Sequence, residues 1–107
     1  YVSDNEKHEV RRYDQGGATK GTVVAGGRGE GGDFNQLSFP NHLFVDTQGN
    51  LYVSDMNNHR VMKWMKGAGG GLVVAGTYGW TEGATDLMLT TGVWVDAHEH
   101  VYVLDQG

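Results

Sequence analysis

The densest cluster of side chains that could bind a metal ion lies near the end of the chain. His98 and His100 flank Glu99, and Asp96 precedes them. Imidazole and carboxylate groups at such short spacing are ligands that zinc and other divalent ions accept. Neighbouring side chains of a strand point to opposite faces, however, and polar residues in a turn are normally solvated. The sequence therefore favours a hairpin turn here, with no metal site and no cofactor.

Carboxylates also recur at fixed places along the chain. Asp4, Asp55 and Asp105 each end a short apolar run, and Asp46 and Asp96 each end another. A short carboxylate at such a place usually accepts hydrogen bonds from backbone N–H groups of the turn that follows. A ring of carboxylates like Asp46 and Asp96 could also hold a cation at the mouth of a channel. We favour the structural role for both sets.

No pattern of residues indicates catalysis. The glycine-rich segment 26–32 follows an apolar run, but neither a helix nor a Lys-Ser/Thr pair follows it, so it predicts a flexible loop rather than a phosphate site. The chain contains no cysteine, and its Ser, His and Asp residues are accounted for by repeated positions rather than by a nucleophile arrangement. We therefore predict no catalytic residues and a protein that is not an enzyme.

The candidate residues belong to a unit that recurs along the chain. The tetrapeptide Tyr-Val-Ser-Asp at 1–4 returns at 52–55, and as Tyr-Val-Leu-Asp at 102–105. The two intervals are 51 and 50 residues, which is in the range of propeller blades. Segments 21–26 and 71–76 also correspond, reading GTVVAG and GLVVAG. These matches predict a structural repeat of about 50 residues.

Each unit contains short apolar runs that are rich in β-branched and aromatic residues and bounded by Gly, Asn and Asp. In the complete central copy they span residues 42–46, 51–55, 60–64 and 72–75. Such runs predict strands, and four antiparallel strands make one propeller blade. We expect an all-β fold in a single domain over 1–107, with a partial blade over 1–26, a full blade over 40–76 and a partial blade over 90–107.

Aromatic residues fall into two groups. Those that recur in register are predicted to pack between neighbouring sheets, where large rings bury much area: Tyr1, Tyr13, Tyr52, Trp64 and Tyr102. Those that do not recur lie in the long connections 26–41 and 76–91, where binding surfaces are often built: Phe34, Phe39, Tyr78 and Trp80.

The segment from Pro40 to Val61 resembles the NHL repeat. The residues that carry the resemblance are Pro40, Val45-Asp46, Gly49-Asn50-Leu51-Tyr52-Val53-Ser54-Asp55 and Asn58-His59-Arg60-Val61. The first copy has Glu9 where Arg60 stands, and the last has Thr90 where Pro40 stands. The resemblance implies about two blades of a six-bladed propeller, so we expect the chain to be a segment of a protein of roughly 300 to 400 residues.

The resemblance implies binding rather than catalysis. We expect a non-catalytic scaffold whose loop face is offered to a protein, peptide or glycan partner. Copies of the chain could also assemble into a closed ring, with three copies as the expected number, or the chain could contact further blades of a longer protein. The residues predicted for the loop face are Phe39, His42, Asn57, Arg60, Tyr78 and Trp80. The polar residues Asn58, His59 and Arg60 are also predicted to close the loop between the second and third strands.

Two other function classes follow from the same resemblance. Propellers similar to NHL proteins include metal-dependent enzymes, namely the amidating lyase and lactonase-like hydrolases, and others bind RNA. The formal net charge of −5 and the pI near 5.3 disfavour nucleic-acid binding, which needs a basic surface. No apolar run is long enough for a membrane helix, so we expect no membrane insertion. The sequence does not determine the compartment, and we favour an extracellular or secreted protein.

Overall fold

The computed structural model describes residues 1–13, 21–76 and 90–105. The predicted all-β class is confirmed, because the described residues form antiparallel strands and one short 3-10 helix. None of the described helices is long and apolar enough to cross a membrane. The elements are β1 (Val2–Asp4), β2 (Glu9–Arg12), β3 (Thr22–Gly26), β4 (Pro40–Val45), β5 (Leu51–Asp55), η1 (Met56–Asn58), β6 (Arg60–Trp64), β7 (Leu72–Gly76), β8 (Thr90–Val95) and β9 (Val101–Asp105).

The central sheet contains four antiparallel strands in the order β4-β5-β6-β7, which is also their order along the chain. β5 and β6 have the predicted bounds, whereas β4 begins at Pro40, two residues earlier than expected. The turn between β4 and β5 is a tight hairpin, because the N–H of Asp46 donates to the carbonyl of Asn50 at 3.0 Å. Gly49 adopts φ +86° in this turn, a backbone conformation that glycine takes at no steric cost.

Two smaller sheets flank the central one. The first sheet has the order β1-β2-β3 and the third pairs β8 with β9. Their pairing follows that of the central sheet: Val2 lies opposite Arg11 as Val53 lies opposite Met62. The register also shifts at corresponding places, between Val10 and Arg11 and between Val61 and Met62.

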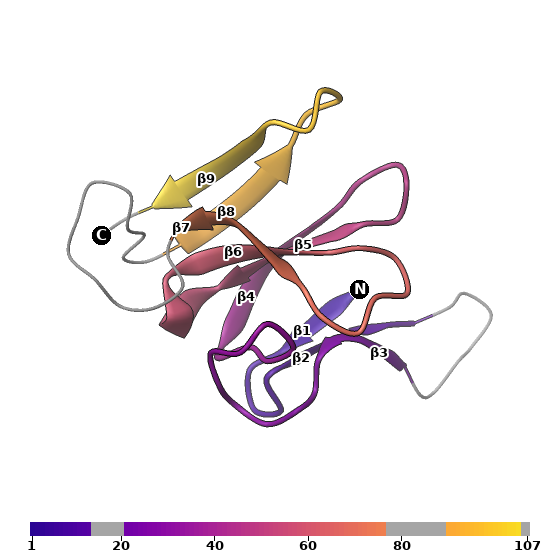
Figure 1. Ribbon diagram of the computed structural model, residues 1–107, viewed down its shortest axis with the longest axis vertical. Helices are drawn as coiled ribbons and strands as arrows, with labels where there is room; N and C mark the ends of the chain where they lie inside the picture. Colours follow the sequence, from indigo (N-terminus) through magenta and orange to yellow (C-terminus); the bar gives the residue numbers. More distant parts are fainter. Residues whose placement is uncertain (14–20, 77–89, 106–107) are drawn as a thin grey trace.

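The three sheets stack face to face in chain order, with the central sheet between the other two (Figure 1). Both faces of the central sheet are therefore covered, and every residue of β5 is buried. One apolar cluster joins the first and central sheets through Val10, Ala25, Leu37, Leu51, Val53, Met62 and Trp64. The other joins the central and third sheets through Tyr52, Val61, Val93 and Val95.

The predicted packing of aromatic residues between sheets holds for two of the five. Tyr52 and Trp64 are buried, one in each apolar cluster. The prediction is wrong for Tyr1, Tyr13 and Tyr102, which are all exposed. The reason is that Tyr13 and Tyr102 lie on the outer faces of the first and third sheets, which no other described element covers.

Candidate functional site

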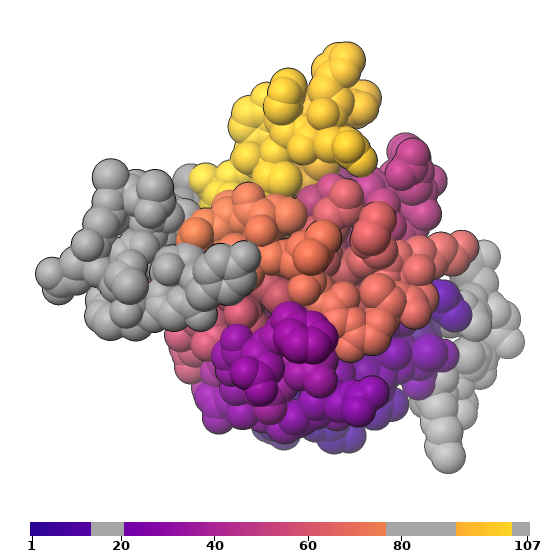
Figure 2. Space-filling view, viewed as in Figure 1, coloured from indigo at the N-terminus to yellow at the C-terminus, as the bar shows by residue number. Residues whose placement is uncertain are grey.

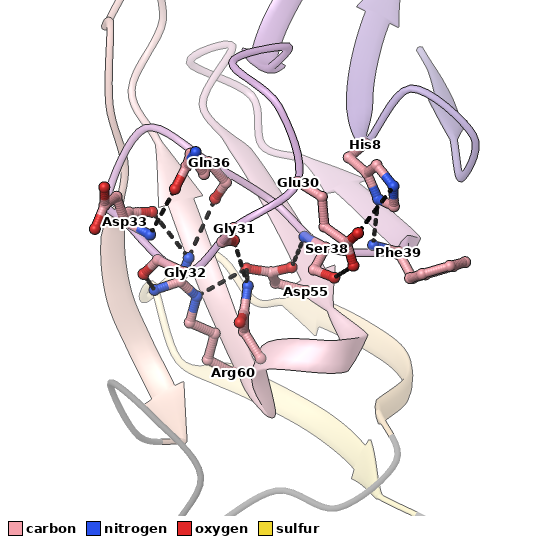
Figure 3. A network of polar contacts seen from close by, with 11 residues as sticks. His8, Glu30, Gly31, Gly32, Asp33, Gln36, Ser38, Phe39, Asp55 and Arg60 are labelled. Atoms are coloured by element: carbon pink, nitrogen blue, oxygen red, sulfur yellow. Dashed lines mark hydrogen bonds and ion pairs between the residues drawn. The ribbon is translucent and has the colours of Figure 1, made fainter.

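A cluster of polar side chains lies where β5 ends and β6 begins, beneath the connection from the first sheet to the central one (Figure 3). Asp55 ends β5, Arg60 begins β6, and the two residues lie opposite each other in register. They are 0% and 1% exposed. A carboxylate and a guanidinium this deeply buried require a full set of partners, because each loses its hydration on folding.

Asp55 receives hydrogen bonds on both carboxylate oxygens. Oδ1 accepts from the backbone N–H of Ser38 at 2.7 Å. Oδ2 accepts from Asn58 Nδ2 at 2.9 Å and from Arg60 Nε at 2.8 Å. Burial raises the pKa of the Asp55 carboxyl, while these three donors and the charge of Arg60 favour the ionised form and oppose that rise. The carboxylate is thus fully bonded within the fold.

The other N–H groups of Arg60 donate to backbone carbonyls of the connection. Nη1 donates to the carbonyl of Gly32 at 2.9 Å, and Nη2 donates to those of Asp33 and Gln36, both at 3.1 Å. Asn58 Nδ2 adds a bond to the carbonyl of Gly31 at 2.8 Å. Arg60 of β6 and Asn58 of η1 therefore hold four carbonyls of segment 31–36, an arrangement that we call the Arg60 clamp.

A second set of contacts holds the end of the same connection. The N–H of Phe39 donates to Nδ1 of His8 at 3.0 Å, so the neutral imidazole carries its proton on Nε2, which lies 3.7 Å from a carboxylate oxygen of Glu30. The hydroxyl of Ser38 donates to the other oxygen of Glu30 at 2.6 Å. The hydroxyl of Ser38 is therefore bonded to a carboxylate, and these three residues do not form a Ser-His pair.

The predicted loop-face residues do not all meet in one place. Phe39 and Asn57 lie close together, since the N–H of Asn57 donates to the carbonyl of Ser38 at 3.1 Å, and both are exposed. His42 is exposed on β4, where it lines a separate hollow of about 340 Å³ with residues of β8 and β9. Arg60 is buried in its clamp and is not part of a surface that a partner can reach. Tyr78 and Trp80 lie outside the described residues.

The predicted loop-closing role is confirmed for Asn58 and Arg60, which both bond to Asp55. Asp55 was predicted to accept from backbone N–H groups of the turn that follows it, but the backbone N–H that it binds is that of Ser38, in the connection before the central sheet.

What the sequence did not indicate is that the connection 27–39 lies on this cluster. Only its glycine-rich part, residues 26–32, was predicted to be a flexible loop, yet the carbonyls of Gly31 and Gly32 are held by the clamp. Further along the connection Leu37 is fully buried in the core, and its carbonyl accepts from the N–H of Gly31 at 3.2 Å. The signal that could have found this arrangement is Leu37, a large apolar residue within a polar, glycine-rich connection.

The opposite end of the sheets carries the residues that resembled a metal site. Oδ1 of Asp96 accepts from the N–H groups of His98 and His100, both at 2.9 Å, and Oδ2 lies 2.9 Å from Nδ1 of His100. These hydrogen bonds, first that from the backbone of His100, lower the pKa of Asp96 to about 2. Asp46 caps its own hairpin in the same way, accepting from Gln48 and Asn50. The predicted turn-capping role is confirmed for both carboxylates.

A hollow of about 510 Å³ separates these two hairpins, and Asp46 and Asp96 both line it. Their oxygens are already engaged within their own turns. Within 1–13, 21–76 and 90–105, no group of three or more His, Cys, Asp or Glu side chains is arranged to hold a metal ion. Asp4 also has the predicted turn role, since it accepts from the N–H groups of Glu6 and Lys7.

Comparison with known proteins adds no assignment. No protein-family model matches the chain, and no curated protein matches it. The function is therefore argued from the geometry of the described residues.

Proposed function

We propose that the chain is a segment of an NHL-type β-propeller that acts as a non-catalytic binding module for a protein or peptide. The four consecutive antiparallel strands of the central sheet support its assignment as a blade. Three of the residues that carry the resemblance also share a structural role, because Asn58 and Arg60 both bind Asp55. The stacking of sheets in chain order supports the same assignment.

The observation that carries the binding function is the Arg60 clamp. It fixes segment 31–36, and Ser38 and Asn57 tie the following residues to the 3-10 helix. Loops that are fixed before association lose little conformational freedom when a partner binds, so more of the contact energy appears as affinity. The scaffold therefore presents Phe39 and Asn57 in a defined arrangement.

The chemistry of this surface fits a peptide. Phe39 is 38% exposed, and its ring packs edge-on against the imidazole of His8, with 4.9 Å between the ring centroids. This contact holds the aromatic ring in place, while the exposed amide of Asn57 supplies a donor and an acceptor nearby. An aromatic anchor beside an amide suits a segment that offers an apolar side chain and backbone hydrogen-bonding groups.

Selection from a random peptide library displayed on phage tests this proposal. The immobilised chain is expected to enrich peptides that lose about tenfold or more in affinity for Phe39→Ala, because the ring buries apolar area worth roughly 1.5 to 3 kcal/mol. Met65→Ala is the matched control, since Met65 is exposed at the opposite end of β6. Selected peptides should bind this control as they bind the wild-type chain.

Two results would overturn the proposal. One is enrichment of peptides that bind Phe39→Ala and Asn57→Ala as tightly as the wild-type chain. The other is no enrichment of peptides in a preparation that does bind an oligosaccharide array, which would assign the surface to glycans instead.

A further inference from the structure

His8 holds the connection 27–39 at both of its ends. It lies in the turn between β1 and β2, with φ +54°. Its backbone carbonyl accepts from the N–H of Gly27 at 3.2 Å, and its imidazole Nδ1 accepts from the N–H of Phe39 at 3.0 Å. Most of the connection between these two bonds is exposed, and Figure 2 shows it in purple at the front of the molecule. The position of Phe39 therefore depends on His8 as well as on the Arg60 clamp.

Phe39 has a backbone conformation that needs such support. Its φ is +55°, in the left-handed region that residues with a Cβ adopt at an energetic cost. Two contacts from His8 oppose this cost, namely the bond to the N–H of Phe39 and the edge-on packing of the two rings (Figure 3). Loss of the hydrogen bond should therefore let Phe39 leave this conformation more often.

The hydrogen bond to Phe39 exists only while the imidazole of His8 is neutral. A backbone N–H is a donor, so Nδ1 must present its lone pair to it. A second ring proton can bind only at Nδ1, where it would face the N–H of Phe39 and replace an attraction by a repulsion. Imidazole is the side chain whose charge ordinarily changes between about pH 5 and 8. A change of pH within that range can therefore break the contact.

A protonated imidazole has an alternative partner beside it. A carboxylate oxygen of Glu30 lies 3.7 Å from Nε2 of His8, and the other oxygen accepts from the hydroxyl of Ser38 at 2.6 Å. An imidazolium is attracted to this carboxylate, while the N–H of Phe39 repels it. Protonation thus exchanges the hydrogen bond to Phe39 for an ion pair with Glu30.

Glu30 is the charged residue that contacts the imidazole within the described segments. On β2, Glu9 pairs with Arg11, and Asp4 at the end of β1 accepts from the backbone of the turn. The other charged side chains of the turn and of the start of the connection are Glu6, Lys7 and Arg28. The counter-charge that an imidazolium at His8 would contact is therefore Glu30.

We propose that His8 is a pH-sensitive latch for the binding surface. The neutral imidazole holds Phe39 in place, and protonation at Nδ1 releases Phe39 and moves the ring to Glu30. Peptide affinity should then fall about two- to tenfold at acidic pH, as expected for the loss of one neutral hydrogen bond. This regulation of binding rests on the proposed function, whereas the latch itself is a property of the free chain and is tested there.

An NMR titration of the free chain between about pH 8 and 5 tests the latch. The amide signal of Phe39 should shift with the same midpoint as the ring signals of His8, because one proton changes both. In His8→Asn the Phe39 signal should stay constant, since Asn tolerates φ +54° and its side-chain oxygen accepts a hydrogen bond without titrating. His98→Asn removes an exposed histidine at the opposite end of the sheets and should keep the wild-type titration.

Two results in the free chain would overturn the latch. One is a Phe39 amide signal that stays constant while the ring of His8 titrates. The other is an unchanged titration of that signal in His8→Asn, because a different group would then cause it. If circular dichroism shows that the variant is unfolded, the common midpoint in the wild-type chain decides.

Binding of a selected peptide that contains no histidine separates the latch from the binding function. Its affinity for the wild-type chain should fall about two- to tenfold between about pH 7.5 and 5.5, and its affinity for His8→Asn should not change. Equal affinity of the wild type at both pH values would refute the regulation. A common midpoint of Phe39 and His8 with no peptide enriched would contradict the proposed function and support the latch, whereas enriched peptides with a constant Phe39 signal would do the reverse.

Discussion

Replacing Arg60 tests the physical account of the clamp most directly. Arg60→Ala leaves the Asp55 carboxylate buried without its cation and removes the donors to three carbonyls. Removing one partner of a buried ion pair costs about 3 to 5 kcal/mol, since the remaining charge is left uncompensated. Natural domains of this size have free energies of unfolding of about 5 to 15 kcal/mol, so this loss would be a large fraction of the stability.

Urea unfolding followed by circular dichroism measures this loss. Arg60→Lys should fall between the wild type and Arg60→Ala, because an ammonium keeps the charge but lacks the planar fork that reaches Asp55 and the carbonyls together. Glu99→Ala is the control, since the side chain of Glu99 is exposed and its contact with Lys63, at 3.8 Å, should contribute less than about 1 kcal/mol. A loss below about 1 kcal/mol for Arg60→Ala would refute the clamp as a stabilising element.

The pH dependence of the destabilisation by Arg60→Ala tests the direction of the pKa shift of Asp55. Burial already raises the pKa of Asp55, and loss of the guanidinium should raise it further. A raised pKa in the folded state means that stability is greatest below the ordinary value of 3.8 and falls as the pH rises through the folded-state pKa. The destabilisation by Arg60→Ala should therefore be larger at pH 7 than at pH 4, and the opposite trend would contradict the account of Asp55.

Two further predictions concern the turns. Because the pKa of Asp96 is lowered to about 2, its carboxylate contributes stability above pH 3.8 that is lost as the pH falls towards 2. Asp96→Asn should therefore remove this part of the acid sensitivity of the fold. An NMR titration of the Asp96 carboxyl with a midpoint near 3.8 would contradict this prediction. Gly26→Ala should lower the free energy of unfolding by about 1 to 3 kcal/mol, since Gly26 has φ +66° and a Cβ would lie 2.5 Å from the carbonyl oxygen of His8. Gly29→Ala, at φ +79° in open space, should cost less in the same urea titration, and equal losses would refute the steric argument.

The sequence predicts the interior of the central sheet better than its edges. β5 and β6 have the predicted bounds because apolar residues fill them and polar turn formers stand at both ends. β4 was predicted from residue 42, but pairing already begins where Pro40 lies opposite Asp55, and the register shifts before Leu43. Pairing across such an irregularity depends on the partner strand, which local sequence does not specify.

The site was predictable where it repeats or follows local turn chemistry. The turn roles of Asp4, Asp46 and Asp96 follow from the short reach of Asp to nearby backbone N–H groups. The contribution of Glu30 and Ser38 could not be predicted in this way, because neither residue recurs at its corresponding position in segment 76–91. Their contacts with each other and with Asp55 also join residues that are 8 and 17 positions apart in the chain. Burial of Arg60 likewise depends on that connection.

Comparison of the first and central sheets explains why the clamp forms where it does. Asp4 lies opposite Glu9 as Asp55 lies opposite Arg60, so the two pairs occupy the same place in the strand pairing. A carboxylate has no N–H group with which to bind carbonyls, and Glu9 pairs with Arg11 instead. The strand framework thus tolerates either residue. What an arginine adds at this position is the ability to hold the connection that crosses its sheet, and with it the arrangement of the loop face.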